Sequence, residues 1–384
     1  MKVYFDNAAT TQIHPKVFEA MIPYLKEEFG NPSSIHSYGR KIRVAIEEAR
    51  ETAAESINAN PSEIYFVSNG TEANNFPLFG IAKTEFNESG RNHIISSKVE
   101  HKCILEPLEE LEKSGYEIQL INSVNFGKVD SEELIKAIKP NTSLISLIHI
   151  NNETGAINDL KRISSLLKGK SIYLHTDAVQ SFGKTKIDVK ELGVDSLSIS
   201  GHKIYGPKGI GFVYVKSGTP LSPQIFGGSQ ERNRRGGTEN PAAIIGLAEA
   251  IKISQIELEN NYQKVSEIKR HFVNELKLLD DKNLIINSDE FCSPYILSLT
   301  FSSKKFKNDA ESFLMYLDIN GIAASNGAAC TSGTLKPSHV ILGIGKSVED
   351  ANGTIRFSFN PNNTIEEVDY TMEVIRKMTQ RFVN

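Results

Sequence analysis

The sequence predicts an α/β fold in which a mostly parallel sheet of seven strands is flanked by helices, together with a smaller α+β domain. Short β-branched runs alternate with stretches of helical periodicity through the first two thirds of the chain. Most of these runs are continuously apolar, which is typical of parallel strands that helices cover on both faces. From Pro241 onward, one long helical pattern precedes a region of different organisation.

Seven runs are expected to form the strands of the large domain, at residues 63–68, 93–97, 117–121, 143–150, 171–178, 196–200 and 211–215. Helical patterns such as "SEELIKAIK" and "LKRISSLLKG" lie between most of them. This alternation favours strands that are connected by helices rather than by hairpins.

A long helix is expected from Pro241 to about Leu279. Its first part is apolar on all sides and its last part is amphipathic, as expected of a helix that leaves one domain and enters another. Beyond it, "YILSLTF", "GIAAS" and "TIRFSF" are strand patterns, and helices are expected near 308–319 and 364–382. The pattern of the first dozen residues fits packing with either part. We assign residues 13–257 to the large domain, and residues 1–12 and 258–384 to the small one.

The composition is that of an ordinary globular enzyme and excludes several other classes. Of the 384 residues, 39% are hydrophobic and 23% are charged, which is enough for a large core. A net charge of −4 leaves no basic surface for nucleic acid, and no apolar run approaches the roughly 20 residues of a membrane span. Three scattered cysteines, Cys103, Cys292 and Cys330, form no CxxC pair and no zinc site. We expect a cytoplasmic enzyme that contacts neither nucleic acid nor membrane directly and holds no resident metal.

Two loops have the composition of an anion site. Strand 63–68 ends at Asn69, Gly70 and Thr71, where a glycine, a hydroxyl and the start of a helix suit a phosphate. The alternative is an ordinary helix start with Thr71 as its N-cap. The segment 227–240 combines glycine pairs with three arginines. Its alternative is a solvated turn.

Lys203 stands in "SLSISGHKIYGPKGIGFVYV", directly after a predicted strand, with Ser200 and His202 beside it. A buried lysine is costly unless its amine is used. Asp177 ends another predicted strand, and a buried acid is costly unless a cation pairs with it. The two residues therefore predict a site that needs both an amine and a carboxylate.

Further polar residues, His101, Asn152 and Gln180, also follow predicted strands. Ligands of open α/β sheets bind beyond the carboxyl ends of the strands, so these side chains are expected to converge. Pyridoxal phosphate would use them all, because it needs a lysine for its Schiff base, a carboxylate at its pyridinium nitrogen and a phosphate cradle. His101 could stack on its ring, and Asn152 or Gln180 could reach its phenolic oxygen. Taken singly, each has a plainer explanation, such as a structural histidine or a helix-capping aspartate.

A series of longer motifs resembles the cysteine desulfurases of the nitrogen-fixation and iron–sulfur-assembly type, which are class V, fold-type I pyridoxal-phosphate enzymes. The resemblance extends from Tyr4 to "TIRFSF" and rests on "YFDNAATT", "GNPSSIHSYGR", "TEANN", "EHK", "NNETG", "HTDAVQSFGK", "SGHKIYGPKGIG", "GTEN" and "AACTS". Departures are small: Gly327, Ala328 and Ala329 stand before Cys330 where relatives often have Gly-Ser-Ala, and Gly236 replaces a common serine.

The resemblance implies a role for each candidate residue. Lys203 would form the Schiff base and act as the base, His101 would stack and transfer protons, and Cys330 would be the nucleophile. The cofactor would be held by Gly70, Thr71, Asn152, Asp177, Gln180, Ser200, His202 and Thr238, with Thr238 reaching the phosphate of the neighbouring subunit of a homodimer. Asn152 and Arg356 would bind the substrate carboxylate.

Cys330 lies in "ASNGAACTSGTLKPSH", whose small residues predict a loop with few core contacts of its own. Cys103 and Cys292 are instead interpreted as buried structural cysteines. The resemblance implies that Cys330 takes sulfur from L-cysteine, leaves L-alanine, and passes its persulfide to an iron–sulfur scaffold or another acceptor protein, with transient binding of an iron–sulfur cluster at this thiol as a further option. The alternatives are a selenocysteine lyase, another class V aminotransferase, or a non-catalytic scaffold for sulfur transfer.

Overall fold

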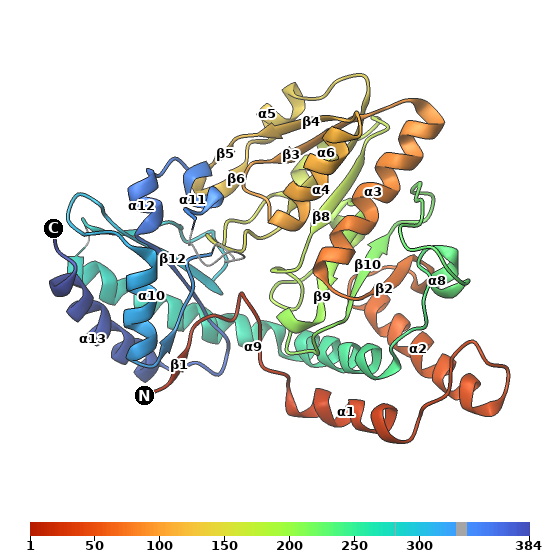
Figure 1. Cartoon of the computed structure of the whole chain (residues 1–384), viewed down its shortest axis with the longest axis horizontal. Helices are drawn as coiled ribbons and strands as arrows, with labels where there is room; N and C mark the ends of the chain where they lie inside the picture. Colours follow the sequence, from red (N-terminus) through yellow and green to blue (C-terminus); the bar gives the residue numbers. More distant parts are fainter. Residues whose placement is uncertain (281, 328–335) are drawn as a thin grey trace.

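A seven-stranded sheet forms the centre of the computed structural model, which describes residues 1–280, 282–327 and 336–384 (Figure 1). Its strands, in spatial order, are β2 (Ile64–Val67), β10 (Gly211–Val215), β9 (Ser196–Ser200), β8 (Tyr173–Asp177), β7 (Thr142–Ile148), β3 (His93–Ser97) and β4 (Glu117–Ile121). Only β10 runs against its two neighbours, and the remaining pairings are parallel. The predicted mostly parallel sheet is therefore confirmed.

The predicted strand boundaries agree closely with the observed ones. The ranges predicted for β3, β4, β9 and β10 are matched residue for residue. β7 ends at Ile148 rather than at residue 150, because Ile150 leaves the sheet and forms an isolated bridge with Ile157. That departure begins the loop that carries Asn152.

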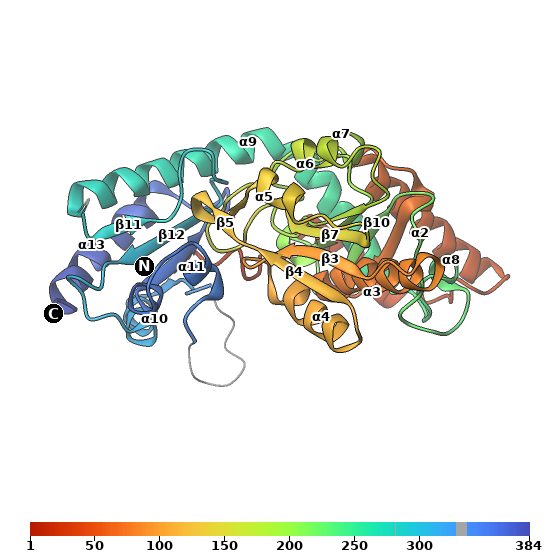
Figure 2. The ribbon, with the colours of Figure 1, turned by 90° about the horizontal axis from the view of Figure 1, so that it is seen from above.

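Helices cover both faces of the sheet, as the continuously apolar strands predicted. The helices that precede Pro241 along the chain are α1 (Pro15–Lys26), α2 (Ser37–Glu55), α3 (Gly70–Ser89), α4 (Lys102–Lys113), α5 (Ser131–Lys136), α6 (Leu160–Leu166), α7 (Val189–Leu192) and α8 (Gln230–Asn233). Successive residues of one strand pack in different cores: Phe212 and Tyr214 join α2, α6 and α9 (Pro241–Asp280), whereas Val213 and Val215 join α3 and α4. Figure 2 shows α6 and α7 on one side of the sheet and α3 and α4 on the other.

The C-terminal part has a core of its own, beyond the long helix α9. It contains the antiparallel sheet β11 (Leu284–Ile286), β12 (Ile296–Phe301) and β14 (Thr354–Ser358), and the helices α10 (Ala310–Ile319), α11 (His339–Gly343), α12 (Val348–Asn352) and α13 (Ile365–Arg381). The second half of α9 supplies Val265, Ile268 and Phe272 to this core, whereas its first half packs in the core of the large sheet. Figure 1 shows α9 running from one part into the other, as predicted.

The N-terminal segment connects the two parts. β1 (Val3–Tyr4) pairs with β13 (Ile322–Ala323), and Val3 and Phe5 are buried in the C-terminal core. The chain then reaches the turn that carries Lys203, where the Thr11 N–H donates to the carbonyl of His202 at 3.0 Å. The proposed boundary at residue 257 stays a prediction, and the separate cores support it. In the part of the chain that the structure describes, no helix has both the length and the apolar character needed to cross a membrane.

We expect Phe5→Ala to destabilise the protein strongly. The ring is fully buried, with its centroid 5.2 Å from that of Phe359 and 6.1 Å from that of Phe272. Loss of so large a buried ring lowers the free energy of unfolding by about 3–5 kcal/mol, measured by urea denaturation. Ile256→Ala on the exposed side of α9, where Ile256 is 85% exposed, is the control and should change it by less than about 0.5 kcal/mol. Equal effects would contradict the assignment of Phe5 to the core.

Candidate active site

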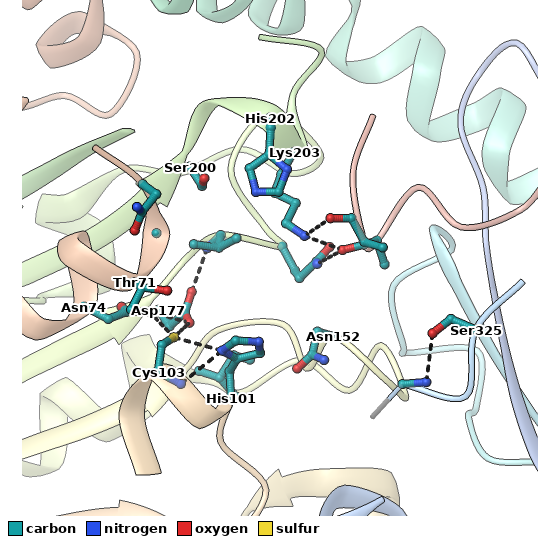
Figure 3. A pocket seen from close by; sticks show the side chains of 18 of the residues that line it. Thr71, Asn74, His101, Cys103, Asn152, Asp177, Ser200, His202, Lys203 and Ser325 are labelled. Atoms are coloured by element: carbon teal, nitrogen blue, oxygen red, sulfur yellow. Dashed lines mark hydrogen bonds between the residues drawn. The ribbon is translucent and has the colours of Figure 1, made fainter. Parts of the chain in front are cut away.

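A cavity of about 330 Å³ lies at the carboxyl ends of the parallel strands, beside β14 of the C-terminal part (Figure 3). Most of the residues predicted from the sequence line it: Gly70, Thr71, His101, Asn152, Asp177, Gln180, Ser200, His202, Lys203 and Arg356. They come from loops far apart in the chain, and the parallel sheet brings these loops to one edge.

Lys203 ends the short turn Gly201–Lys203 that follows β9. Its Nζ donates to the backbone carbonyls of Ala8 and Ala9, both at 2.6 Å. Burial lowers the pKa of Lys203 to about 8, and the positive charge of Arg356 acts in the same direction. The amine is therefore easily deprotonated, as a nucleophile requires.

Asp177 is the last residue of β8 and is 4% exposed. Its Oδ1 accepts the Val179 N–H at 2.9 Å, and its Oδ2 accepts an N–H of Asn74 at 2.8 Å. None of the ion pairs among the described residues includes this carboxylate. Burial raises the pKa of this carboxyl group, and the hydrogen bonds from Val179 and Asn74 and the nearby Lys203 amine offset part of the rise. A cationic group of a ligand would provide the partner that the carboxylate lacks.

The N-terminus of α3 forms one end of the cavity. Asn69 is the N-cap, because its side chain accepts the Glu72 N–H at 2.9 Å, so the alternative of a capping Thr71 is wrong. A Cβ on Gly70 would lie 3.1 Å from Val179 Cγ2 and 3.3 Å from the Cβ of Ser200, so a larger residue would crowd this end of the cavity. Ser200 Oγ is buried and has no hydrogen-bond partner among the described residues.

His202 borders the same end of the cavity. Its Nδ1 lies 3.1 Å from Thr10 Oγ1, and burial lowers the pKa of its imidazole to about 4. A neutral imidazole can still donate one hydrogen bond. The His202 imidazole, the free hydroxyl of Ser200 and the start of the 20-residue helix α3 together form a site that suits a phosphate group.

His101 and Cys103 border the cavity from the N-terminus of α4. The Nδ1 of His101 accepts the Cys103 N–H at 3.2 Å and lies 2.9 Å from Cys103 Sγ, so the ring is held by the helix it caps (Figure 3). Burial lowers the pKa of the His101 imidazole, which favours its neutral form.

Arg356 reaches the cavity from β14. One terminal nitrogen, Nη1, donates to the backbone carbonyl of Asn152 at 3.0 Å, and the other, Nη2, donates to Asp6 Oδ1 at 2.9 Å. Each keeps a second N–H, because a guanidinium carries five. The buried Oδ1 of Asn152 has no partner among the described residues. Arg356 can therefore bind a carboxylate, and Asn152 Oδ1 can accept a hydrogen bond from an N–H next to that carboxylate.

The sequence did not identify two of the cavity's polar groups. Asn74 holds Asp177, and its place in "TEANN", one helical turn after Gly70, was the signal available. Cys103 was interpreted as a buried structural residue, and this was wrong: it is half-buried, lines the cavity and lies 4.0 Å from Asp177 Oδ2. Burial and the nearby carboxylate raise the pKa of its thiol far above the usual range, so Cys103 is no thiolate. Cys292 is buried, as expected.

Two predicted residues are not among those that line this cavity. Thr238 is exposed and borders a separate hollow next to Ser68 and Gly209. Its proposed contact with a neighbouring subunit stays a prediction. Cys330 lies outside the described residues; the described chain stops at Gly327, which lines the cavity, and resumes at Lys336.

The groups of the cavity fit pyridoxal phosphate. An amine of low pKa, a buried carboxylate without a paired cation, and a cradle with a free hydroxyl at a helix start match its aldehyde, ring nitrogen and phosphate. Arg356, whose guanidinium can bind a carboxylate, lines the same cavity.

Comparisons with known proteins lead to the same family. A model of the family described as aminotransferase class-V matches residues 3–371. A cysteine desulfurase IscS of Dictyoglomus turgidum is 44% identical over 388 residues, covering 99% of this chain and 95% of the relative. A solved NifS-like protein gives a TM-score of 0.91 at 34% identity and 100% coverage of both chains. A structure described as SspA in complex with cysteine gives a TM-score of 0.80 at 33% identity, covering 94% of this chain and 100% of that one.

The reactivity of Lys203 in the cofactor-free protein should depend on pH in a distinctive way. Since burial lowers its pKa to about 8, acetylation by a small amine-reactive reagent should rise as the pH passes through about 8. The exposed Lys113, whose pKa is raised by Glu110, should react only at higher pH. Peptide mass mapping of protein labelled across a pH series measures both. Parallel labelling curves would contradict the lowered pKa of Lys203.

Proposed function

Because this chain belongs to the cysteine desulfurases within the class-V aminotransferase family, we propose that it removes sulfur from L-cysteine. The products are L-alanine and a persulfide on Cys330. One observation carries the proposal: the cavity combines the amine of Lys203, the unpaired buried carboxylate of Asp177 and the anion cradle at the start of α3.

The residues of the cavity would hold pyridoxal phosphate, which when bound would supply an electron sink for the carbon next to the substrate nitrogen. Lys203 would hold its aldehyde, and Asp177 would hold its ring nitrogen. His101 would pack against the ring, and Gln180 would donate to the phenolic oxygen. Gly70, Thr71, Ser200 and His202 would hold the phosphate.

The substrate is oriented by its carboxylate. Arg356 offers the second N–H of each terminal nitrogen, while Asp6 and the Asn152 carbonyl keep the guanidinium in place. This places the α-carbon of the substrate toward Lys203. The Lys203 amine would take the α-proton of the substrate as a base, and its lowered pKa favours this role. His101, which also lines the cavity, would transfer further protons.

Sulfur transfer needs a second thiol. The Cys330 thiolate forms a bond to the substrate sulfur as the carbon–sulfur bond breaks. The electron pair of that bond stays on the carbon skeleton, which takes up protons and leaves as L-alanine. Gly327 lines the cavity, and the three residues from there to Cys330 span at most about 11 Å, which supports access of this thiol to the substrate.

We further propose that the enzyme is a homodimer in which Thr238 contacts the phosphate of the neighbouring subunit. Three apolar side chains are largely exposed, which supports a protein–protein interface: Phe29 at 80%, Ile35 at 87% and Phe226 at 77%. The persulfide on Cys330 would pass to an iron–sulfur scaffold or another acceptor protein, and the same thiol could bind a cluster transiently.

Intact mass spectrometry tests the proposed reaction. Cofactor-loaded protein treated with L-cysteine, without reductant, should gain the mass of one sulfur atom, and a thiol should remove it. Cys330→Ala should keep the cofactor and gain nothing, whereas Lys203→Ala should lose the covalent link to the cofactor. A loaded wild-type protein that gains no sulfur would contradict the proposal, and a gain of selenium from selenocysteine alone would favour the lyase.

A further inference from the structure

A second lysine, Lys184, is buried next to the active site, where it lines a separate hollow that Lys203 also lines. Lys184 is 7% exposed, and none of the ion pairs in residues 1–280, 282–327 and 336–384 includes it. Its Nζ donates to Gln180 Oε1 at 2.8 Å and lies 5.6 Å from the centre of the Tyr295 ring. Burying a lysine side chain with so few partners is unfavourable for folding. A gain in stability therefore does not explain its contact with Gln180.

The amide of Gln180 is held at both ends. Its Nε2 donates to the backbone carbonyl of Ala8 at 2.9 Å, and its Oε1 accepts from Lys184. The Ala8 carbonyl can only accept, so it requires an N–H at one end of the amide, and Lys184 donates to the oxygen at the other end. The two contacts therefore favour the same orientation of the amide. The Ala8 carbonyl also accepts from Lys203 at 2.6 Å, which brings the amide next to the lysine of the active site.

We propose that Lys184 is a positioning residue that fixes the amide of Gln180 so that an N–H, rather than the oxygen, faces the phenolic oxygen of the cofactor. The inference rests on the proposed function, since Gln180 needs a ligand oxygen to bind. Nε2 carries two N–H groups, so it can donate to Ala8 and to the ligand at once. The reversed amide would direct its oxygen at two acceptors and its N–H groups at the Lys184 amine. Among the residues that the structure describes, Lys184 alone donates to the oxygen end of the amide.

A double-mutant cycle on cofactor affinity tests this role. The dissociation constant of pyridoxal phosphate is measured by titrating the cofactor-free protein. Lys184→Met should weaken binding by about fivefold to tenfold in the wild-type background, as expected for the loss of one oriented hydrogen bond. In a Gln180→Ala background the same substitution should change affinity by less than about twofold, because nothing is left to orient.

The visible absorption maximum of the bound cofactor gives a readout that a purely structural role would not move. Lys184→Met and Gln180→Ala should shift it in the same direction, and the double variant should shift it no further. Lys184→Arg, which keeps a cationic donor, should restore most of the affinity. Lys184→Leu serves as a second charge-free variant, and circular dichroism confirms folding of each protein before titration.

A matched control comes from another buried lysine. Lys269 is 8% exposed and donates to the backbone carbonyl of Ser293 at 2.9 Å, and it is not among the residues that line the cavity. Lys269→Met should therefore leave the affinity within about twofold of the wild type. An equal loss of affinity from Lys184→Met with and without Gln180 would overturn the inference. If the wild-type protein failed to bind pyridoxal phosphate, the proposed function itself would fail, which is a distinguishable result.

Discussion

Asp177 imposes the constraint on which the site depends. Its carboxylate is buried at the end of β8, accepts hydrogen bonds from Asn74 and from the Val179 backbone, and has no cation paired with it among the described residues. Such an arrangement is unfavourable in an empty cavity, because burial raises the pKa of the group. A cationic group in the cavity would make it favourable. In the proposed function, this carboxylate is one half of an ion pair, and the ring nitrogen of the cofactor is the other half.

The N-terminal segment connects this site with the C-terminal part. The Ala8 carbonyl accepts from both Lys203 and Gln180, and Asp6 holds one arm of Arg356. This segment begins in the C-terminal core. The groups that we propose for cofactor binding and for substrate binding therefore contact the same stretch of chain. The placement of Arg356 over the cavity therefore depends on how the two parts pack together.

The sequence predicts those features of the fold and of the site that depend on one local pattern of residues. Continuous apolar runs predicted the parallel strands, and their last residues predicted Asp177 and the turn with Lys203, because side chains at strand ends converge in such sheets. Contacts between distant segments were not predictable. Asn74 was missed because its partner is 103 residues away, and Cys103 was misplaced because a lone cysteine carries no local signal of the cavity it lines. Lys184 and Gln180 are four residues apart, so their contact is local. The orientation of the Gln180 amide also depends on the Ala8 carbonyl, which lies 172 residues away in the chain.

The most direct test of the central claim compares pyridoxal phosphate with an analogue whose ring nitrogen is replaced by C–H. If Asp177 pairs with the ring nitrogen, the cofactor-free protein should bind pyridoxal phosphate at least about tenfold more tightly than the analogue, as expected for a charge-assisted hydrogen bond. In Asp177→Asn the two affinities should differ by less than about threefold. Equal binding of both compounds by the wild-type protein would contradict the account, because the buried carboxylate would then have a role unrelated to the ring nitrogen.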